Sequence, residues 1–186
     1  MNGVVLTHGA GSNADSPLLV KLAAAFEAAG WRAVRYNMAY RRLRPTGPPF
    51  PAQAAADRAG LAEQAARMRE AVDGMVVLGG HSYGGRMSSM EAATQHGIVD
   101  ALLLLSYPLH PPRKPQQIRT AHFPYLRTPA LFVHGTRDPF GSVEELGGAM
   151  KEIPTKTRLV TVERAGHELK GIDPALVVAT FEEFLR

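Results

Sequence analysis

The chain has 186 residues, of which 45% are hydrophobic and 20% are charged. This length suits one domain and is too short for two of ordinary size, and the composition is typical of a folded globular protein rather than a disordered one. Cysteine is absent, which excludes disulfides, zinc sites built on thiolates and a cysteine nucleophile. We therefore treat residues 1–186 as a single domain.

Hydropathy and charge indicate where the protein is expected to be located and which partners it is expected to have. No apolar run approaches the roughly 20 residues that span a bilayer, and no secretory signal pattern is present at the N-terminus, so we expect a cytoplasmic protein without membrane association. The net charge of +4 is concentrated in two basic stretches, Arg35–Arg44 and Arg113–Arg127. A nucleic-acid-binding protein could have such stretches, but neither an aromatic RNA-binding signature nor a zinc spacing accompanies them. We interpret them as solvated surface that could steer anionic small molecules toward a cleft, and we expect no nucleic-acid partner.

Short apolar runs alternate with longer amphipathic segments along the whole chain. The predicted strands are Val4–Thr7, Ala33–Tyr36, Met75–Leu78, Ala101–Leu105, Ala130–His134 and Arg158–Val162. The predicted helices are about Pro17–Ala29, Ala52–Val72, Tyr83–His96, Val143–Lys151 and Pro174–Leu185. Nearly uninterrupted apolar runs are typical of parallel strands buried on both faces. The alternation therefore predicts an α/β fold, a three-layer αβα sandwich around a mainly parallel sheet of about six strands.

Local signals mark some element ends and two irregular segments. Gly30 suits the left-handed residue that ends a helix, and Asp173 suits an N-cap. The basic, proline-rich segment Tyr40–Pro51 and the proline-rich segment Tyr107–Tyr125 are predicted as loops over the strand ends. The second is too short for a helical lid, so we expect it to form one wall of a pocket. The residues expected to contact a substrate there and in a later loop are Tyr107, His110 and Phe140.

The most informative motif is Gly80-His81-Ser82-Tyr83-Gly84, which lies between a predicted strand and a predicted helix. In this setting Gly-x-Ser-x-Gly predicts a nucleophile elbow, a sharp strained turn that exposes the serine hydroxyl. The flanking glycines allow the close backbone approach that such a turn needs. The alternatives are an incidental serine in a glycine-rich turn or a phosphate-binding loop, but the phosphate-binding signatures are absent.

A nucleophilic serine needs a base to remove its proton and an acid to orient that base. In one common chain order the acid and then the base follow the serine. We assign the acid to Asp138, just after a predicted strand, and the base to His167, in the loop after the last strand. The other downstream aspartates have structural interpretations: Asp100 precedes a strand and Asp173 is a helix cap. Among the other histidines, His96 at a helix end and His134 inside a strand are interpreted as structural, whereas His110 and His122 could line a pocket.

A developing oxyanion needs two hydrogen-bond donors. The first is predicted to be the backbone N–H of Tyr83, which directly follows the serine. The second is expected in the loop after the first strand, where the sequence reads His8-Gly9-Ala10-Gly11. The N–H of Ala10 is the preferred donor, with Gly9 and Gly11 as alternatives, and His8 is expected to fix the loop by hydrogen bonding. A glycine-rich turn without function is the other interpretation.

These motifs, in the order His8-Gly9, Ser82, Asp138 and His167, resemble the α/β-hydrolase superfamily over most of the chain. The segments Ser106-Tyr107-Pro108-Leu109-His110-Pro111-Pro112 and Gly135-Thr136-Arg137-Asp138-Pro139-Phe140-Gly141 are similar to a small hydrolase family. That family includes the hydrolase-like domains of the mammalian testis-expressed and NSL-complex proteins, and it is distantly similar to dienelactone hydrolases, which use cysteine where Ser82 stands here. The resemblance implies a minimal α/β-hydrolase fold without a large cap domain, in which the first strand matches the third of a full hydrolase.

Together the residues and the resemblance predict a serine hydrolase that cleaves a small ester, thioester or similar acyl compound through an acyl-enzyme. Ser82 is the expected nucleophile, His167 the base and Asp138 the acid. The expected partner is a small-molecule acyl substrate, and no metal or organic cofactor is expected. The alternative is a non-catalytic protein-interaction domain that keeps the hydrolase fold, because fold alone does not establish activity. Nucleic-acid binding is a third, weaker hypothesis.

Overall fold

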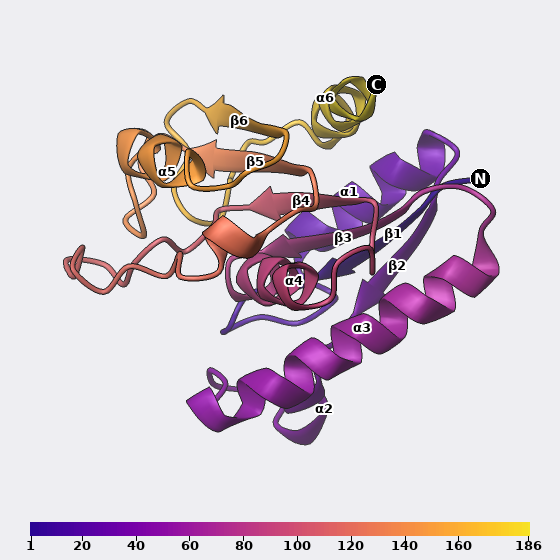
Figure 1. Cartoon of the computed structure of the whole chain (residues 1–186), viewed down its shortest axis with the longest axis horizontal. Coiled ribbons are helices and arrows are strands. Elements are labelled where there is room, and N and C mark those ends of the chain that lie inside the picture. The colour runs from indigo at the N-terminus through magenta and orange to yellow at the C-terminus, as the bar shows by residue number, and fades with distance from the viewer.

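A computed structural model describes all residues, 1–186, as six parallel strands and six α-helices (Figure 1). The strands are β1 (Gly3–Thr7), β2 (Arg32–Tyr36), β3 (Val76–His81), β4 (Ala101–Leu105), β5 (Ala130–Gly135) and β6 (Thr157–Val162). The helices are α1 (Pro17–Ala28), α2 (Ala39–Leu43), α3 (Ala54–Ala71), α4 (Tyr83–Thr94), α5 (Val143–Met150) and α6 (Pro174–Leu185). The strand order is β2-β1-β3-β4-β5-β6, and every neighbouring pair is parallel. The predicted α/β architecture is confirmed.

The three layers follow from the two-residue period of the strands, because successive side chains point to opposite faces of a sheet. In β3, Val76 and Leu78 pack in the core on one face, and Val77 packs in the core on the other. Helices α3, α4 and α5 cover the first face, and α1 and α6 cover the second (Figure 1). Both faces of the central strands are therefore buried, which explains their nearly continuous apolar sequences.

The structure confirms the predicted strands and the five long helices, and it corrects some of their bounds. Gly30 has a φ of 83° directly after α1, and the side chain of Asp173 accepts hydrogen bonds from two backbone N–H groups at the start of α6. Strand β3 runs three residues beyond the predicted Leu78, because Gly79, Gly80 and His81 stay paired with the neighbouring β4. Sequence patterning misses these three residues because glycine and histidine do not read as strand formers.

One helix is unexpected, since α2 (Ala39–Leu43) lies in the segment predicted as a loop. The backbone N–H of Tyr40 donates to Oδ1 of the fully buried Asp57 at 3.0 Å, which satisfies one of the free donors at the start of this helix. Tyr40 and Arg41 are themselves buried. The helix thus depends on tertiary contacts that a five-residue segment does not reveal.

The chain between β4 and β5 contains the longest irregular segment, residues 106–129, which is interrupted only by a short 3-10 turn at Phe123–Tyr125. It extends from the side of the molecule toward which the strand arrows point (Figure 1). No large cap domain is present, as predicted. None of the helices combines the length and the apolar character that crossing a membrane requires.

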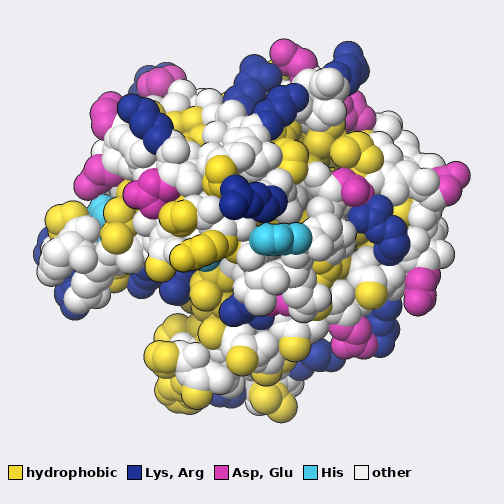
Figure 2. Space-filling view, viewed as in Figure 1, with side chains coloured by type: hydrophobic (Ala, Val, Ile, Leu, Met, Phe, Trp, Pro, Cys, Tyr) yellow, Lys and Arg dark blue, Asp and Glu magenta, His cyan; other side chains and the backbone are white.

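The face in Figure 2 shows how the surface charges are distributed. Basic and acidic side chains are interspersed there rather than gathered into one basic stripe (Figure 2). Hydrophobic side chains gather at the lower edge of this view, near α2 and the start of α3 (Figures 1 and 2). Within the two basic stretches, Arg41 is buried and Arg119 is half-buried, so these stretches are only in part the solvated surface expected from the sequence.

Aromatic packing between α1 and α6 provides a test of the fold. Phe26 in α1 is fully buried, with ring centroids 5.2 Å from Trp31 and 6.2 Å from Phe181 in edge-to-face contacts. We expect Phe26→Ala to lower the free energy of unfolding by about 3–5 kcal/mol, because it removes buried area and leaves a cavity. Val20→Ala, at an exposed position of the same helix, should change it by less than about 0.5 kcal/mol. Urea titration followed by circular dichroism measures both, and a loss below about 1 kcal/mol for Phe26→Ala would contradict this packing.

Candidate active site

Ser82 lies at the junction of β3 and α4, at the carboxyl edge of the sheet. Its φ is 53° and its ψ is −115°, a backbone conformation that residues other than glycine rarely adopt. The turn is held from both sides, because the N–H of Ser82 donates to the carbonyl of Leu105 at 2.8 Å and its carbonyl accepts from the N–H of Arg86 at 3.0 Å. The strained turn predicted from the sequence is therefore present.

The glycines on either side of Ser82 permit direct contact between backbones. A Cβ atom at Gly80 would lie 2.4 Å from the backbone of Gly84 and Gly85, and one at Gly84 would lie 2.7 Å from the carbonyl oxygen of His8. Real Cβ atoms do not come so close to other atoms, and backbone cannot move aside as a flexible side chain can. These glycines are thus required for steric reasons.

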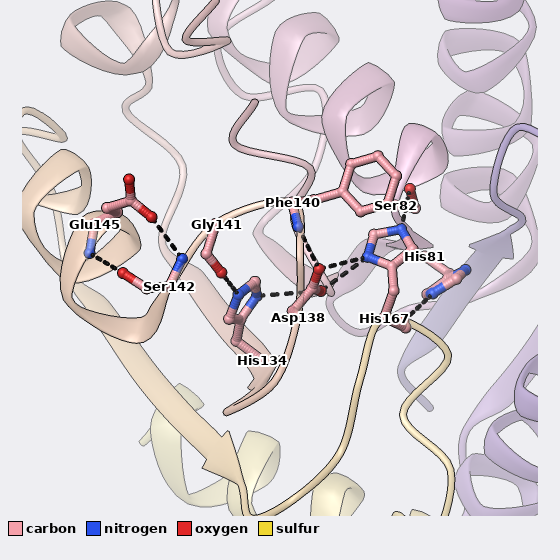
Figure 3. Close-up of polar contacts among 9 residues, drawn as sticks. All are labelled: His81, Ser82, His134, Asp138, Phe140, Gly141, Ser142, Glu145 and His167. Atoms are coloured by element: carbon pink, nitrogen blue, oxygen red, sulfur yellow. Dashed lines mark hydrogen bonds and ion pairs between the residues drawn. The ribbon is translucent and has the colours of Figure 1, made fainter. Parts of the chain in front are cut away.

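His167 and Asp138 meet Ser82 in one continuous hydrogen-bonded series (Figure 3). Nε2 of His167 lies 2.8 Å from Oγ of Ser82, and its Nδ1 lies 2.8 Å and 3.0 Å from the two carboxylate oxygens of Asp138. The side chain of Asp138 is completely buried, and that of His167 is 14% exposed. Since the three residues lie far apart in the sequence, their convergence is a property of the tertiary fold.

Neighbouring groups fix the imidazole and the carboxylate. The ring of Phe140 stacks on that of His167, with centroids 4.1 Å apart and an interplanar angle of 26° (Figure 3). The N–H of Phe140 also donates to Oδ1 of Asp138 at 2.9 Å. The loops after β5 and β6 are joined by a bond of 2.9 Å from the N–H of Arg137 to the carbonyl of Ala165. Phe140, expected to contact substrate, therefore also orients the His167 ring.

His81 helps to position the loop that carries His167, a role that the sequence did not predict. Its Nε2 lies 2.8 Å from the backbone carbonyl of His167, and because a carbonyl only accepts, this nitrogen donates. Burial lowers the pKa of His81, which keeps its ring neutral. Gly9 packs against the same ring, since a Cβ there would lie 3.0 Å from Nδ1 of His81. His81 thus connects the loop after β1 with the loop that carries His167.

The loop after β1 lies directly beside the serine. A Cβ at Gly9 would lie 3.4 Å from Cβ of Ser82. The N–H of Ala10 donates to no protein acceptor. The N–H of Tyr83 is the first of α4 and lies before the intrahelical bonds begin. Two donors are therefore free on the two segments that flank Ser82.

Buried polar side chains hold that loop through its carbonyl groups. The hydroxyl of Tyr40 lies 2.8 Å from the carbonyl of Ala10, and the guanidinium of Arg41 donates to the carbonyls of Ala10 and Ser12 at 3.0 Å and 2.7 Å. Nε2 of His8 accepts from a backbone N–H at 3.2 Å, so its Nδ1 carries the proton and donates to the carbonyl of Gly9 at 2.9 Å. Burial lowers the pKa of His8, which favours this neutral form. The structure confirms that His8 fixes the loop, whereas Tyr40 and Arg41 were assigned to an irregular segment.

Ser82 and His167 open into a cavity of about 870 Å³. Gly9, Ala10 and Tyr83 line it on the serine side. The apolar side chains around it belong to Pro48, Pro49, Phe50, Pro51, Ala54, Met87, Met90, Pro108 and Phe140. A site of this size and mixed lining suits a small organic molecule.

Tyr107 and His110 do not line this cavity, which corrects the expectation that they contact substrate. Tyr107 is fully buried in the core, where its hydroxyl donates to the carbonyl of Arg119 at 2.7 Å. His110 is buried too, with Nδ1 2.8 Å from the carbonyl of Pro111 and Nε2 3.5 Å from Oε2 of Glu145. The segment does supply a cavity wall, but through Pro108 and Arg119. Sequence periodicity cannot predict the direction of side chains in irregular backbone.

The other candidates considered for acid and base have structural contacts. Asp100 lies before β4, where it pairs with Arg69 at 2.7 Å. His134 is buried in β5, and its Nε2 donates to the carbonyl of Gly141 at 2.7 Å (Figure 3). His96 is exposed at the end of α4. No three His, Asp or Glu side chains of the chain converge so that they could hold a metal ion.

Comparison with known proteins identifies the class to which this fold corresponds. Residues 1–174 match a family described as an alpha/beta hydrolase domain, so the chain belongs to the α/β-hydrolase family. Its fold is similar to that of a dienelactone hydrolase from Anabaena variabilis, with a TM-score of 0.76 and 20% identity over 98% of this chain and 83% of that chain. It is also similar to Est1E from Butyrivibrio proteoclasticus with ferulic acid bound, with a TM-score of 0.77 and 19% identity over 100% of this chain and 88% of that chain. An alpha-beta serine hydrolase homologue from Coxiella burnetii has a TM-score of 0.73 and 18% identity over 99% of this chain and 83% of that chain.

The steric requirement at the turn predicts opposite effects for two glycine substitutions. We expect Gly80→Ala to lower the free energy of unfolding by about 1–3 kcal/mol, because the added methyl group overlaps backbone that cannot move aside. Gly148→Ala is the matched control, since Gly148 lies in α5 and an alanine methyl group there would meet no atom within 4 Å beyond its own helix. It should raise the free energy of unfolding by about 0.5–1 kcal/mol, because alanine is the better helix former. Equal stability of the two variants in urea titrations would show that the backbones at the elbow are not in contact.

Proposed function

We propose that this protein is a serine hydrolase that cleaves a small ester, thioester or similar acyl compound through an acyl-enzyme. The observation that carries the proposal is the hydrogen-bonded series Ser82–His167–Asp138 at the wall of the cavity. A serine hydroxyl becomes nucleophilic when a base accepts its proton, and a buried carboxylate on the far side of that base fixes its orientation and tautomer. Ser82, His167 and Asp138 have this arrangement, with His167 between the hydroxyl and the carboxylate.

In the first half-reaction, Oγ of Ser82 attacks the acyl carbon while Nε2 of His167 accepts the hydroxyl proton. The negative charge that develops on the carbonyl oxygen is stabilised by the N–H groups of Ala10 and Tyr83. The bond to the leaving group then breaks, and His167 returns the proton to the departing oxygen or sulfur atom. This leaves an acyl ester on Ser82 and a neutral imidazole.

In the second half-reaction, a water molecule takes the place of the leaving group. His167 accepts a proton from the water as its oxygen attacks the acyl carbon, and it returns the proton to Oγ when the ester bond to Ser82 breaks. Asp138 stays ionised and stabilises the imidazolium formed in each half. The sequence of steps needs a small acyl substrate and water, and it requires no metal or organic cofactor.

The alternative, a non-catalytic interaction domain with the same fold, leaves two observations without a purpose. A loop is anchored by three buried polar side chains so that an unpaired N–H lies beside Ser82, and a strained φ is maintained at Ser82 itself. Such strain costs on the order of 1–3 kcal/mol and persists chiefly at functional sites. Because both interpretations share the fold, the choice between them rests on these two observations.

Removal of the nucleophile is the direct test. Ser82→Ala should abolish covalent labelling by a fluorophosphonate probe and lower kcat on a 4-nitrophenyl ester by at least about 10³-fold, because members of such a series act as a unit. Ser16→Ala is the control, since the Ser16 side chain makes no capping bond and lies outside the cavity. It should label and turn over like the unmodified protein. Undiminished labelling of Ser82→Ala would place the nucleophile elsewhere.

The role of the buried carboxylate is tested by Asp138→Asn. The amide occupies the same space, so the fold should persist by circular dichroism, but it favours the wrong imidazole tautomer and should lower kcat by up to about 10⁴-fold. Glu144→Gln makes the same chemical change at an exposed position in the first turn of α5 and should leave kcat unchanged. If both variants turn over equally, Asp138 does not act as the orienting acid.

A further inference from the structure

Two arginines that the proposed reaction does not use line the same cavity as Ser82. Arg86 lies in α4, one helical turn after Ser82, and Arg119 lies in the irregular segment between β4 and β5. Both residues are half-buried. The ion pairs of the protein involve neither guanidinium, and Nε of Arg86 is buried without any hydrogen-bond partner. An unpaired donor of this kind is costly to bury, so its presence requires an explanation.

Two other arginines with restricted exposure show how the protein satisfies such a group when its role is structural. Arg41 is also buried, and its guanidinium donates to the backbone carbonyls of Ala10, Ser12, Arg44 and Gly47. Arg58 pairs with Glu91 at 2.9 Å. The guanidinium groups of Arg86 and Arg119 make no hydrogen bond or ion pair within the chain. Arg44 also has an unpaired buried nitrogen, but Arg86 and Arg119 line the cavity, where a partner can reach them from outside the chain.

No acidic side chain of the protein pairs with Arg86 or Arg119, so their positive charges are not neutralised by the chain. The pKa of Arg119 is lowered, first by burial and then by the charge of Arg86. The pKa of His122 is lowered to about 4, first by burial and then by the charges of Arg86 and Arg58. His122 is therefore neutral at pH 7. The one acidic residue that lines the cavity is Glu168, which is exposed and directly follows His167.

We propose that Arg86 and Arg119 bind a carboxylate of the substrate while its ester or thioester group lies at Ser82. This inference rests on the proposed function and adds the substrate class, an acyl compound that carries a free carboxylate. A guanidinium presents two parallel N–H groups that match the two oxygens of a carboxylate. Phe50, Met87, Met90 and Phe140 line the same cavity, which suits an apolar chain or ring between the carboxylate and the scissile bond.

The first test compares esters that differ only in charge. The mono-4-nitrophenyl ester of adipic acid places the carboxylate in the acyl part, and 4-nitrophenyl hexanoate is its neutral counterpart of equal chain length. The acetyl ester of 4-hydroxybenzoate places the carboxylate in the leaving group, and its methyl ester is the neutral counterpart. We expect kcat/KM to be at least about tenfold higher for the charged member of one of these two pairs, as for one hydrogen-bonded ion pair retained in the transition state.

Substitutions of the two arginines then test whether they cause the preference for the charged ester. Arg86→Gln and Arg119→Gln should each lower the preference for the charged ester by about tenfold and leave kcat/KM for the neutral ester within about twofold. Arg119→Lys should recover part of the preference, since it keeps the charge but loses the planar pair of donors. Arg127→Gln is the control for net charge, because Arg127 is exposed and does not line the cavity. It should leave the preference unchanged.

Binding to the Ser82→Ala protein keeps this inference separate from the proposed reaction. Calorimetry with monomethyl adipate and with dimethyl adipate should detect tighter binding of the charged ligand, and Arg86→Gln in the same background should remove the difference. If the unmodified protein hydrolysed none of the four esters while the Ser82→Ala protein still bound the charged ligand selectively, the proposed function would be overturned and the carboxylate site supported. Equal hydrolysis of charged and neutral esters, or equal binding of the two ligands, would overturn the carboxylate site and leave the serine hydrolase intact.

Discussion

The candidate site depends on one steric constraint, the direct contact of three backbone segments around Ser82. The turn after β3 touches the start of α4 at Gly80 and Gly84, and the latter also touches the end of β1 at His8. No side chain fits between these segments, and Ser82 between them has a positive φ. The same contact brings Gly9 alongside the serine. The proposed nucleophile and the proposed oxyanion donors are thus positioned by backbone packing rather than by flexible side chains.

Two neutral histidines hold the loops that surround this backbone contact. His8 and His81 are both buried, their pKa values are lowered by that burial, and each donates one N–H to a backbone carbonyl. One fixes the loop after β1 and the other fixes the loop that carries His167. An ionised imidazole would be costly at either place. His8 and His81 thus fix loops, whereas His167 faces Ser82, and these differences follow from burial and hydrogen-bond partners.

The cavity is lined by Ser82 at the rigid edge of the sheet and also by two arginines. Most buried charges of the chain are satisfied by carbonyls or carboxylates, as Arg41 and Arg58 are. The guanidinium groups of Arg86 and Arg119 have no such partner within the chain, and both residues line the same cavity as Ser82. In a partly buried site a charge interacts strongly over several ångströms, since little water screens it. The proposed carboxylate site and the proposed reaction at Ser82 therefore use different parts of one cavity.

The sequence by itself predicted the alternation of strands and helices, the elbow around Ser82 and the convergence of Asp138 and His167 on it, because apolar periodicity, glycine spacing and position after a strand are local signals. It did not determine α2, the last three residues of β3 or the orientation of Tyr107 and His110. These depend on contacts between distant segments, such as the bond from Tyr40 to Asp57. The positions of His81, Arg86 and Arg119 in the site were likewise decided only by the tertiary structure. A side chain's direction and its lack of a partner are properties of the packed molecule, and no local pattern encodes them.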